Sequence, residues 1–120
     1  MLLRASGKAT KNTFDLVGIV NDEIDCGVPH GAVLIRFAAT LLGRDVEALD
    51  RARNDLRDAL GDEGVTAASI TAAAFSLVDR AANGVGIWVE PMVLKPSADF
   101  RAAMGINQFP SAQNTFARPD

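Results

Sequence analysis

Residues 64–84, GVTAASITAAAFSLVDRAANG, decide the fold of this chain. At helical spacing, the polar side chains of this stretch fall on one narrow stripe: Thr66, Ser69, Ser76, Arg80 and Asn83. Nearly all other residues are Ala, Val, Ile, Leu or Phe, and a helix that is apolar around most of its circumference is surrounded by protein. We therefore predict that residues 65–83 form the central helix of an all-α domain. The side chains expected to point into its neighbours are Ile70, Ala74, Phe75, Leu77 and Val78.

Three further long helices and one short helix are predicted around this central one. Apolar residues recur at helical spacing over 14–25, and GAVLIRFAATLL at 31–42 is apolar on most sides. Residues 46–60 follow Asp45, a predicted N-cap, and combine one apolar face with one charged face. A short helix is expected at 98–104, after Pro91 and Pro96. The predicted fold class is all-α, a small bundle of four main helices plus a short C-terminal helix, with no sheet.

The 120 residues are expected to form one domain, because a chain of this length can bury a core without disulfides or metals. Residues 1–11 hold little apolar surface and predict a flexible N-terminal arm. The domain is expected to span 12–110, followed by a C-terminal tail at 111–120 that has no periodicity.

The composition excludes several classes of function. The chain has a net charge of −3, and its acidic and basic residues are interleaved. Nucleic-acid binding needs a basic face, so this class of function is not expected. No apolar run approaches the ~20 residues of a membrane-spanning helix, and the first residues do not resemble a signal peptide. A single cysteine fits a reducing compartment, so the cytoplasm is the expected location.

The reactive side chains are densest in DEIDCGVPH at residues 22–30, which holds the only thiol and the only imidazole. Cys26 and His30, with Glu23, are the candidate catalytic residues, because an imidazole can promote thiolate formation. Pro29 argues against one helix that carries both, and the alternative is a buried, inert cysteine beside a helix start. One Cys and one His cannot complete a zinc site, so neither a metal nor a cofactor is expected.

A polar seam between two helices is the second candidate site. Arg36 and Arg80 could bind an anion or a carboxylate there, and Trp88 could line a ligand pocket. The alternative is structural: the arginines pair with carboxylates, and the hydroxyl groups bond to backbone carbonyls one turn back.

Three stretches carry a resemblance to a known family: HGAVLIRFAATLLGRDVEALDRARNDLRDALG, AASITAAAFSLVDRAANGVGI and SADFRAAMGINQF. Over about residues 29–110 the chain resembles alkylhydroperoxidase-like proteins of the carboxymuconolactone decarboxylase superfamily. The resemblance implies an all-α fold that assembles as dimers, trimers or hexamers. Peroxidase members use C-x-x-C-x-x-x-H, and the alignable frame here is Glu23-x-x-Cys26-x-x-x-His30. With Glu23 in place of the first cysteine, the dithiol cycle is not supported.

Three interpretations of function follow. The first is a helical homo-oligomer of this superfamily that lacks dithiol peroxidase activity and binds a small apolar or carboxylate ligand. The second is a small enzyme, peroxidase-like or decarboxylase-like, that uses Cys26 with His30 or Arg36 with Arg80. The third is a protein-interaction module. Because two helices are apolar on most sides, we predict at least a dimer that buries upwards of ~2,000 Å² through helix 31–42 and the loop 88–94.

Overall fold

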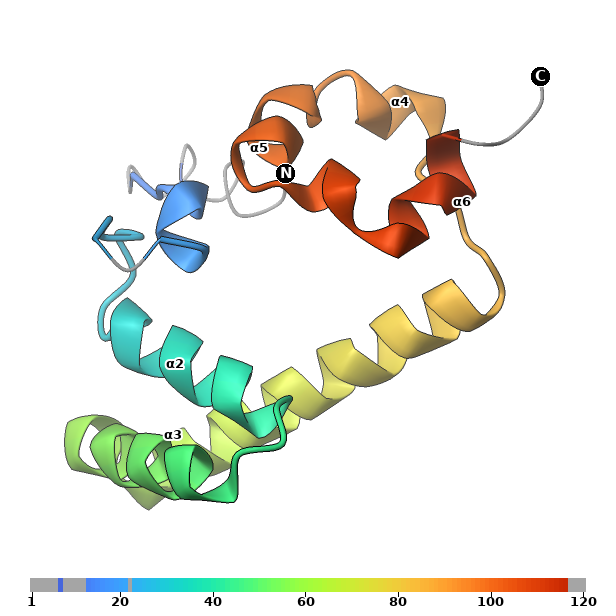
Figure 1. Ribbon diagram of the computed structural model, residues 1–120. Coiled ribbons are helices and arrows are strands. Elements are labelled where there is room, and N and C mark those ends of the chain that lie inside the picture. Colours follow the sequence, from blue (N-terminus) through green and yellow to red (C-terminus); the bar gives the residue numbers. More distant parts are fainter. Residues whose placement is uncertain (1–6, 8–12, 22, 117–120) are drawn as a thin grey trace. The chain divides into compact units, whose positions relative to one another are not determined.

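A computed structural model describes Gly7, residues 13–21 and residues 23–116 of the chain (Figure 1). Over these residues the chain is mostly helical and contains no strand, which confirms the all-α class. The predicted arm at residues 1–11 lies almost entirely outside them. The chain divides into two compact units, Val28–Arg80 and a second unit that combines Met1–Gly27 with Ala81–Asp120. Each unit is described by itself.

The unit Val28–Arg80 is built on two helices, α2 (Gly31–Leu41) and α3 (Val46–Gly84), where α3 continues beyond the unit. Figure 1 shows α2 lying against the first part of α3. The buried core consists of Phe37 from α2 with Ala52 and Leu56 from α3. Partly buried apolar side chains surround it: Val33, Leu34, Leu41, Leu49, Val65 and Ala68. The burial of Ala52 and Leu56, with Leu49 beside them, confirms the middle of the apolar face predicted for residues 46–60, whereas Val46 and Leu60 at its ends are exposed.

Gly61 interrupts α3, with φ 71° and ψ −179° in an otherwise helical segment. This conformation is open essentially to glycine alone. We name the two resulting pieces the first part (residues 46–60) and the second part (residues 62–84) of α3. The first part begins at a cap, because the Asp45 carboxylate accepts a hydrogen bond from the Ala48 N–H at 2.9 Å. The two parts confirm the separate helices predicted at 46–60 and 65–83.

Within the unit Val28–Arg80, the second part of α3 is not surrounded by protein, so the prediction of a buried central helix was wrong. Only one side packs on the core, through Val65 and Ala68. Phe75, predicted to be core, leaves 68% of its surface exposed. The other side chains expected to be buried are likewise exposed: Ile70, Ala74, Leu77 and Val78. Only the start of this helix packs on α2 and the first part of α3, and an apolar circumference needs neighbours along its whole length.

The helix predicted at 14–25 was also wrong. Only η1 (Leu16–Ile19) is helical there, as one 3₁₀ turn. Three Asp or Asn side chains accept the backbone N–H two residues ahead and so compete with helical hydrogen bonds: Asp15 from Val17, Asn21 from Glu23, and Asp25 from Gly27.

Gly18 lets this segment fold back on itself. A Cβ on Gly18 would lie 2.6 Å from the carbonyl oxygen of Ile24 and 2.8 Å from the backbone nitrogen of Cys26. The Asp15 N–H then donates to the Cys26 carbonyl at 3.1 Å. The glycine that weakens the helical pattern is therefore the residue that permits the turn.

Residues 85–116 hold a series of short helices (Figure 1). They are α4 (Pro91–Leu94), α5 (Ala98–Ala103), η2 (Ile106–Gln108), η3 (Pro110–Ala112) and α6 (Gln113–Phe116). The helix predicted at 98–104 is confirmed by α5. Pro91 begins α4 rather than preventing it, because proline is tolerated at the first helical position. The predicted tail at 111–120 is helical over the six residues that the structure describes.

Candidate functional site

An exposed apolar stripe runs along the second part of α3. It consists of Ala67, Ile70, Ala74, Leu77 and Ala81, and we name it the α3 apolar face. The spacings alternate between three and four residues, so these side chains share one side of the helix. Alanine recurs at every seventh position and a large aliphatic residue lies between each pair. This spacing is the one that allows a second helix to pack closely along the stripe.

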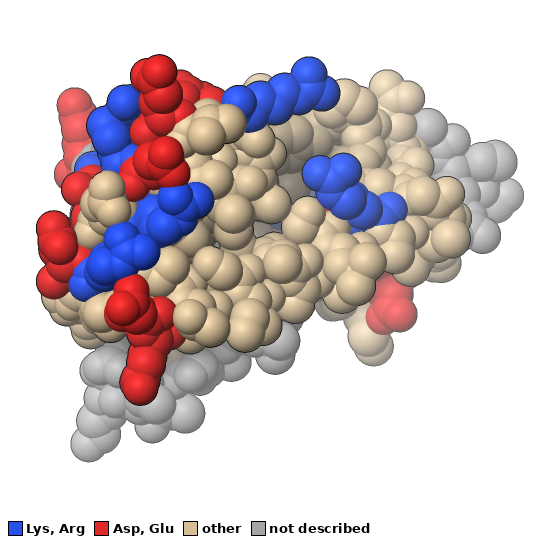
Figure 2. Space-filling view, turned by 90° about the horizontal axis from the view of Figure 1, so that it is seen from below, with Lys and Arg blue, Asp and Glu red and all other residues tan. Residues whose placement is uncertain are grey.

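Charge is separated from this face. Of the two charged residues between positions 64 and 84, Asp79 lies on the opposite side of the helix from the stripe, and Arg80 lies at its edge, three residues after Leu77. In the first part of α3 the charged residues are dense instead. Figure 2 shows acidic and basic side chains intermixed over that part, beside a surface on which charged side chains are few. The first part exposes mainly charged side chains, whereas the second part exposes mainly apolar ones.

The structure does not place the three candidate catalytic residues on one helix. Cys26 is buried, at 7% exposure, and follows the turn that Gly18 permits. His30 is exposed and has a left-handed backbone (φ 57°) before the first residue of α2. Glu23 is exposed, and its N–H donates to the Asn21 side chain. Cys26 belongs to one unit and His30 to the other.

Arg36 and Arg80, the candidate anion-binding residues, have separate partners. The Arg36 guanidinium lies 3.4 Å from the Asp55 carboxylate, so it links α2 to the first part of α3. The Arg80 Nε donates to the Ser76 hydroxyl at 3.2 Å, one turn back on the same helix. The hydroxyl groups of Thr40 and Ser69 each donate to a carbonyl one turn back. Trp88, the candidate pocket residue, is partly exposed at 40% and lies in the extended segment between α3 and α4.

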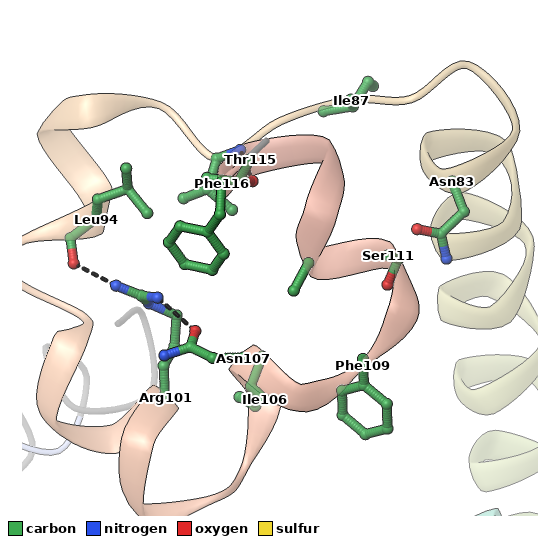
Figure 3. A pocket seen from close by; sticks show the side chains of 12 residues that line it. Asn83, Ile87, Leu94, Arg101, Ile106, Asn107, Phe109, Ser111, Thr115 and Phe116 are labelled. Carbon is green, nitrogen blue, oxygen red and sulfur yellow. Dashed lines mark hydrogen bonds between the residues drawn. The ribbon is translucent and has the colours of Figure 1, made fainter. Parts of the chain in front are cut away.

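Arg101, which the sequence interpretation did not single out, holds the helical segment 85–116 together. Its Nε donates to the Ser97 hydroxyl at 2.9 Å, its Nη1 to the Asn107 side chain at 2.6 Å, and its Nη2 to the Leu94 carbonyl at 2.7 Å. The Phe116 ring lies over the guanidinium, 5.7 Å from its central carbon. Arg101 thereby joins α4, α5, η2 and α6 (Figure 3).

A cavity of about 180 Å³ opens beside Arg101. Figure 3 shows it between the Arg101 and Phe116 side chains and the last turn of α3. Its other lining residues are mainly apolar, with a few side-chain hydroxyls and amides: Asn83, Ile87, Val89, Leu94, Ile106, Asn107, Phe109, Ser111, Ala112 and Thr115. The i, i+4 spacing of Ser97 and Arg101 could have indicated their hydrogen bond from the sequence. No pattern in the sequence indicated that Asn107 in η2 and Phe116 in α6 would also contact Arg101.

No described group of three or more His, Cys, Asp or Glu side chains is arranged to hold a metal ion. Among the described helices, none is both long and apolar enough to cross a membrane. No protein-family model matches the chain, and no curated protein and no solved structure matches it either.

Proposed function

We propose that this chain is a helical protein that assembles with copies of itself through the α3 apolar face, and that it acts without dithiol redox chemistry. The observation that carries the proposal is the exposure of Ile70 and Leu77, at 65% and 70%, on a helix face without charge. Monomeric proteins rarely leave contiguous apolar patches larger than a few hundred Å² in water.

The stripe is suited to pairing with its own copy. Two antiparallel helices related by a two-fold axis at Ala74 bring Ile70 of each copy near Leu77 of the other. The same axis brings Ala67 near Ala81, so small residues face small residues and the helix axes can approach to about 8 Å. A two-fold interface of this kind uses the same patch on both copies, and it is the commonest arrangement in oligomers.

The gain and the cost of association are of similar size. Burying a Leu or Ile side chain contributes about 1.5–3 kcal/mol. The four Ile70 and Leu77 side chains of a dimer therefore contribute about 6–12 kcal/mol, whereas association costs about 4–15 kcal/mol. Val78 and the alanines add to this amount. Because the gain and the cost are close, we expect one charged residue within the stripe to dissociate the dimer.

The interface proposed here lies on α3 rather than on helix 31–42. The apolar residues of α2, Val33, Leu34, Phe37 and Leu41, already pack within the chain. The resemblance of residues 29–110 to alkylhydroperoxidase-like proteins supports self-association, because that resemblance implies helical oligomers. The single, buried Cys26 supports the absence of dithiol chemistry, since a disulfide cycle within one chain needs two thiols. It also supports a reducing, cytoplasmic location.

Sedimentation velocity of Leu77→Glu tests the proposal. Val46→Glu is the matched control, because Val46 and Leu77 are equally exposed, at 70%, and Val46 lies outside the stripe. We expect the parent chain and Val46→Glu to sediment at twice the chain mass or more at ~100 µM, a concentration that populates a micromolar dimer. Leu77→Glu should sediment as a single chain. A parent chain that is monomeric at that concentration, or a Leu77→Glu variant that still assembles, would contradict the proposal.

A further inference from the structure

We propose that the cavity beside Arg101 binds a small carboxylic acid with a benzene-sized apolar body. This site is separate from the α3 apolar face, and the proposal does not depend on self-association. It rests on three properties of the cavity: its size, the apolar character of its walls, and the single positive charge at its edge.

The size and the walls set the apolar part of the ligand. The cavity holds about 180 Å³, and an apolar protein cavity of ~150 Å³ is large enough to bind benzene. Ile87, Leu94, Ile106, Phe109 and Phe116 supply the apolar walls. Removing these apolar side chains from water is favourable, so an apolar group that covers them is bound. One ring with a short substituent fills this space.

The partners of Arg101 set the charge of the ligand. Its three hydrogen bonds go to a hydroxyl, a side-chain amide oxygen and a backbone carbonyl, none of which carries a negative charge. None of the salt bridges between described residues involves Arg101. The guanidinium has five N–H groups, so two remain beyond its three hydrogen bonds to described residues. A carboxylate adds the attraction of opposite charges to such hydrogen bonds, which the neutral partners of Arg101 do not supply, so a bound anion is favoured at this edge.

The charge also favours a carboxylate over a phosphate. Among the described residues that line the cavity, Arg101 is the one that carries a charge. One guanidinium balances one carboxylate, whereas a phosphate carries up to two charges and three strong acceptor oxygens that call for more cationic partners. A neutral ligand of the same shape would fill the apolar walls but leave the positive charge unbalanced. The preferred ligand therefore carries one negative charge on an aromatic body.

Phenylacetate is the probe that tests this site. Trp88 is the only tryptophan of the chain and lies between Ile87 and Val89, which both line the cavity, so its fluorescence can report binding. Phenylacetamide is the matched control ligand, because it has the same size and no charge. We expect phenylacetate to bind the full chain at least about tenfold more tightly than phenylacetamide, as a charged hydrogen bond predicts. Amide NMR shifts should be confined to the lining residues and their neighbours.

Two variants locate the binding. Arg101→Gln removes the charge and should reduce the affinity for phenylacetate to that for phenylacetamide, at least about a tenfold loss. Arg101 also joins several helices, so a second variant keeps it: Ala112→Leu reduces the cavity volume and should weaken both ligands by a similar factor. If Arg101→Gln does not fold, the ligand pair and Ala112→Leu decide the question.

The proposal is overturned if phenylacetate and phenylacetamide bind the parent chain equally, if neither binds, or if Ala112→Leu binds phenylacetate as the parent does. Sedimentation of the parent chain does not bear on these outcomes, so failure here is distinguishable from failure of self-association. The expected signature is a preference for the anion that disappears with the Arg101 charge.

Discussion

The two parts of α3 belong to one segment of chain but use their surfaces in opposite ways. The first part, residues 46–60, places Ala52 and Leu56 in the core and leaves its charged side in water. The second part, residues 62–84, uses Val65 and Ala68 at its start and then leaves large apolar side chains exposed. An amphipathic helix can bury its single apolar face within one chain, whereas a helix that is apolar on most sides needs more neighbours than α2 and the first part of α3 supply here.

The largest expected difference between the two parts is in the cost of shortening a leucine. Leu56 is fully buried, at 0% exposure, whereas Leu77 is 70% exposed. Leu56→Ala should lower the free energy of unfolding by about 2–5 kcal/mol, because it creates a cavity in the core. Leu77→Ala should lower it by less than about 1 kcal/mol at a concentration where the chain is monomeric. Urea denaturation measures both.

Equal losses from the two leucine variants in dilute solution would mean that the chain itself covers the second part of α3. If the loss from Leu77→Ala instead grows with protein concentration, the missing contact is between copies, because association stabilises the folded state by mass action.

An intermediate loss of stability is expected from a substitution at Gly61, where the two parts of α3 meet. A Cβ on Gly61 would meet nothing within 4 Å, so only the backbone conformation opposes a substitution there. Gly61→Ala should destabilise the chain by about 1–3 kcal/mol, the cost of a side chain in a conformation that glycine alone favours. Gly84→Ala is the control, because Gly84 also has open space around it and no positive φ. It should be neutral or stabilising by up to about 1 kcal/mol in urea denaturation.

A loss from Gly84→Ala as large as that from Gly61→Ala would contradict the backbone explanation. A Gly61→Ala variant with higher helicity and unchanged stability would show that the two parts can join into one straight helix without cost.

The smallest effect is expected from the ion pair that fixes the first part of α3 to α2. Arg36 and Asp55 lie 3.4 Å apart and both are more than half exposed. A double-mutant cycle with Arg36→Ala and Asp55→Ala should give a coupling of about 0.2–1 kcal/mol, typical of exposed pairs. The coupling should fall as salt is added. A larger, salt-independent coupling would mean that a partner buries this pair in the assembled protein.

The segment before α2 shows why a periodic pattern can fail. Leu16, Val17, Val20 and Ile24 recur at helical spacing, yet only one 3₁₀ turn forms. The pattern describes side chains, but Asp15, Asn21 and Asp25 act on the backbone and offer it hydrogen bonds that a helix would otherwise use. Because Asp15, Asn21 and Asp25 can be read from the sequence, the absence of a long helix at 14–25 could have been predicted.

The Arg101 site was not predicted from the sequence, for a different reason. Its contacts join residues from four short helices, and each helix has too few residues for a periodic signal. The reactive cluster at residues 22–30 shows the reverse case, because residues close in sequence lie in different environments. Cys26 is buried, whereas His30 is exposed. Neighbourhood in the chain predicts neighbourhood in space only where one regular element holds both residues.

The sequence by itself determined the all-α class, the three helical segments at 31–42, 46–60 and 65–83, the break near Gly61 and the buried face of residues 46–60. These features depend on interactions between residues a few positions apart, such as the Asp45 cap and the repeated spacing of Leu49, Ala52 and Leu56. Only the tertiary structure decided which sides of the second part of α3 have neighbours and where Arg101 meets Phe116. Those outcomes depend on how distant segments share a limited amount of covering surface, which a local pattern does not encode.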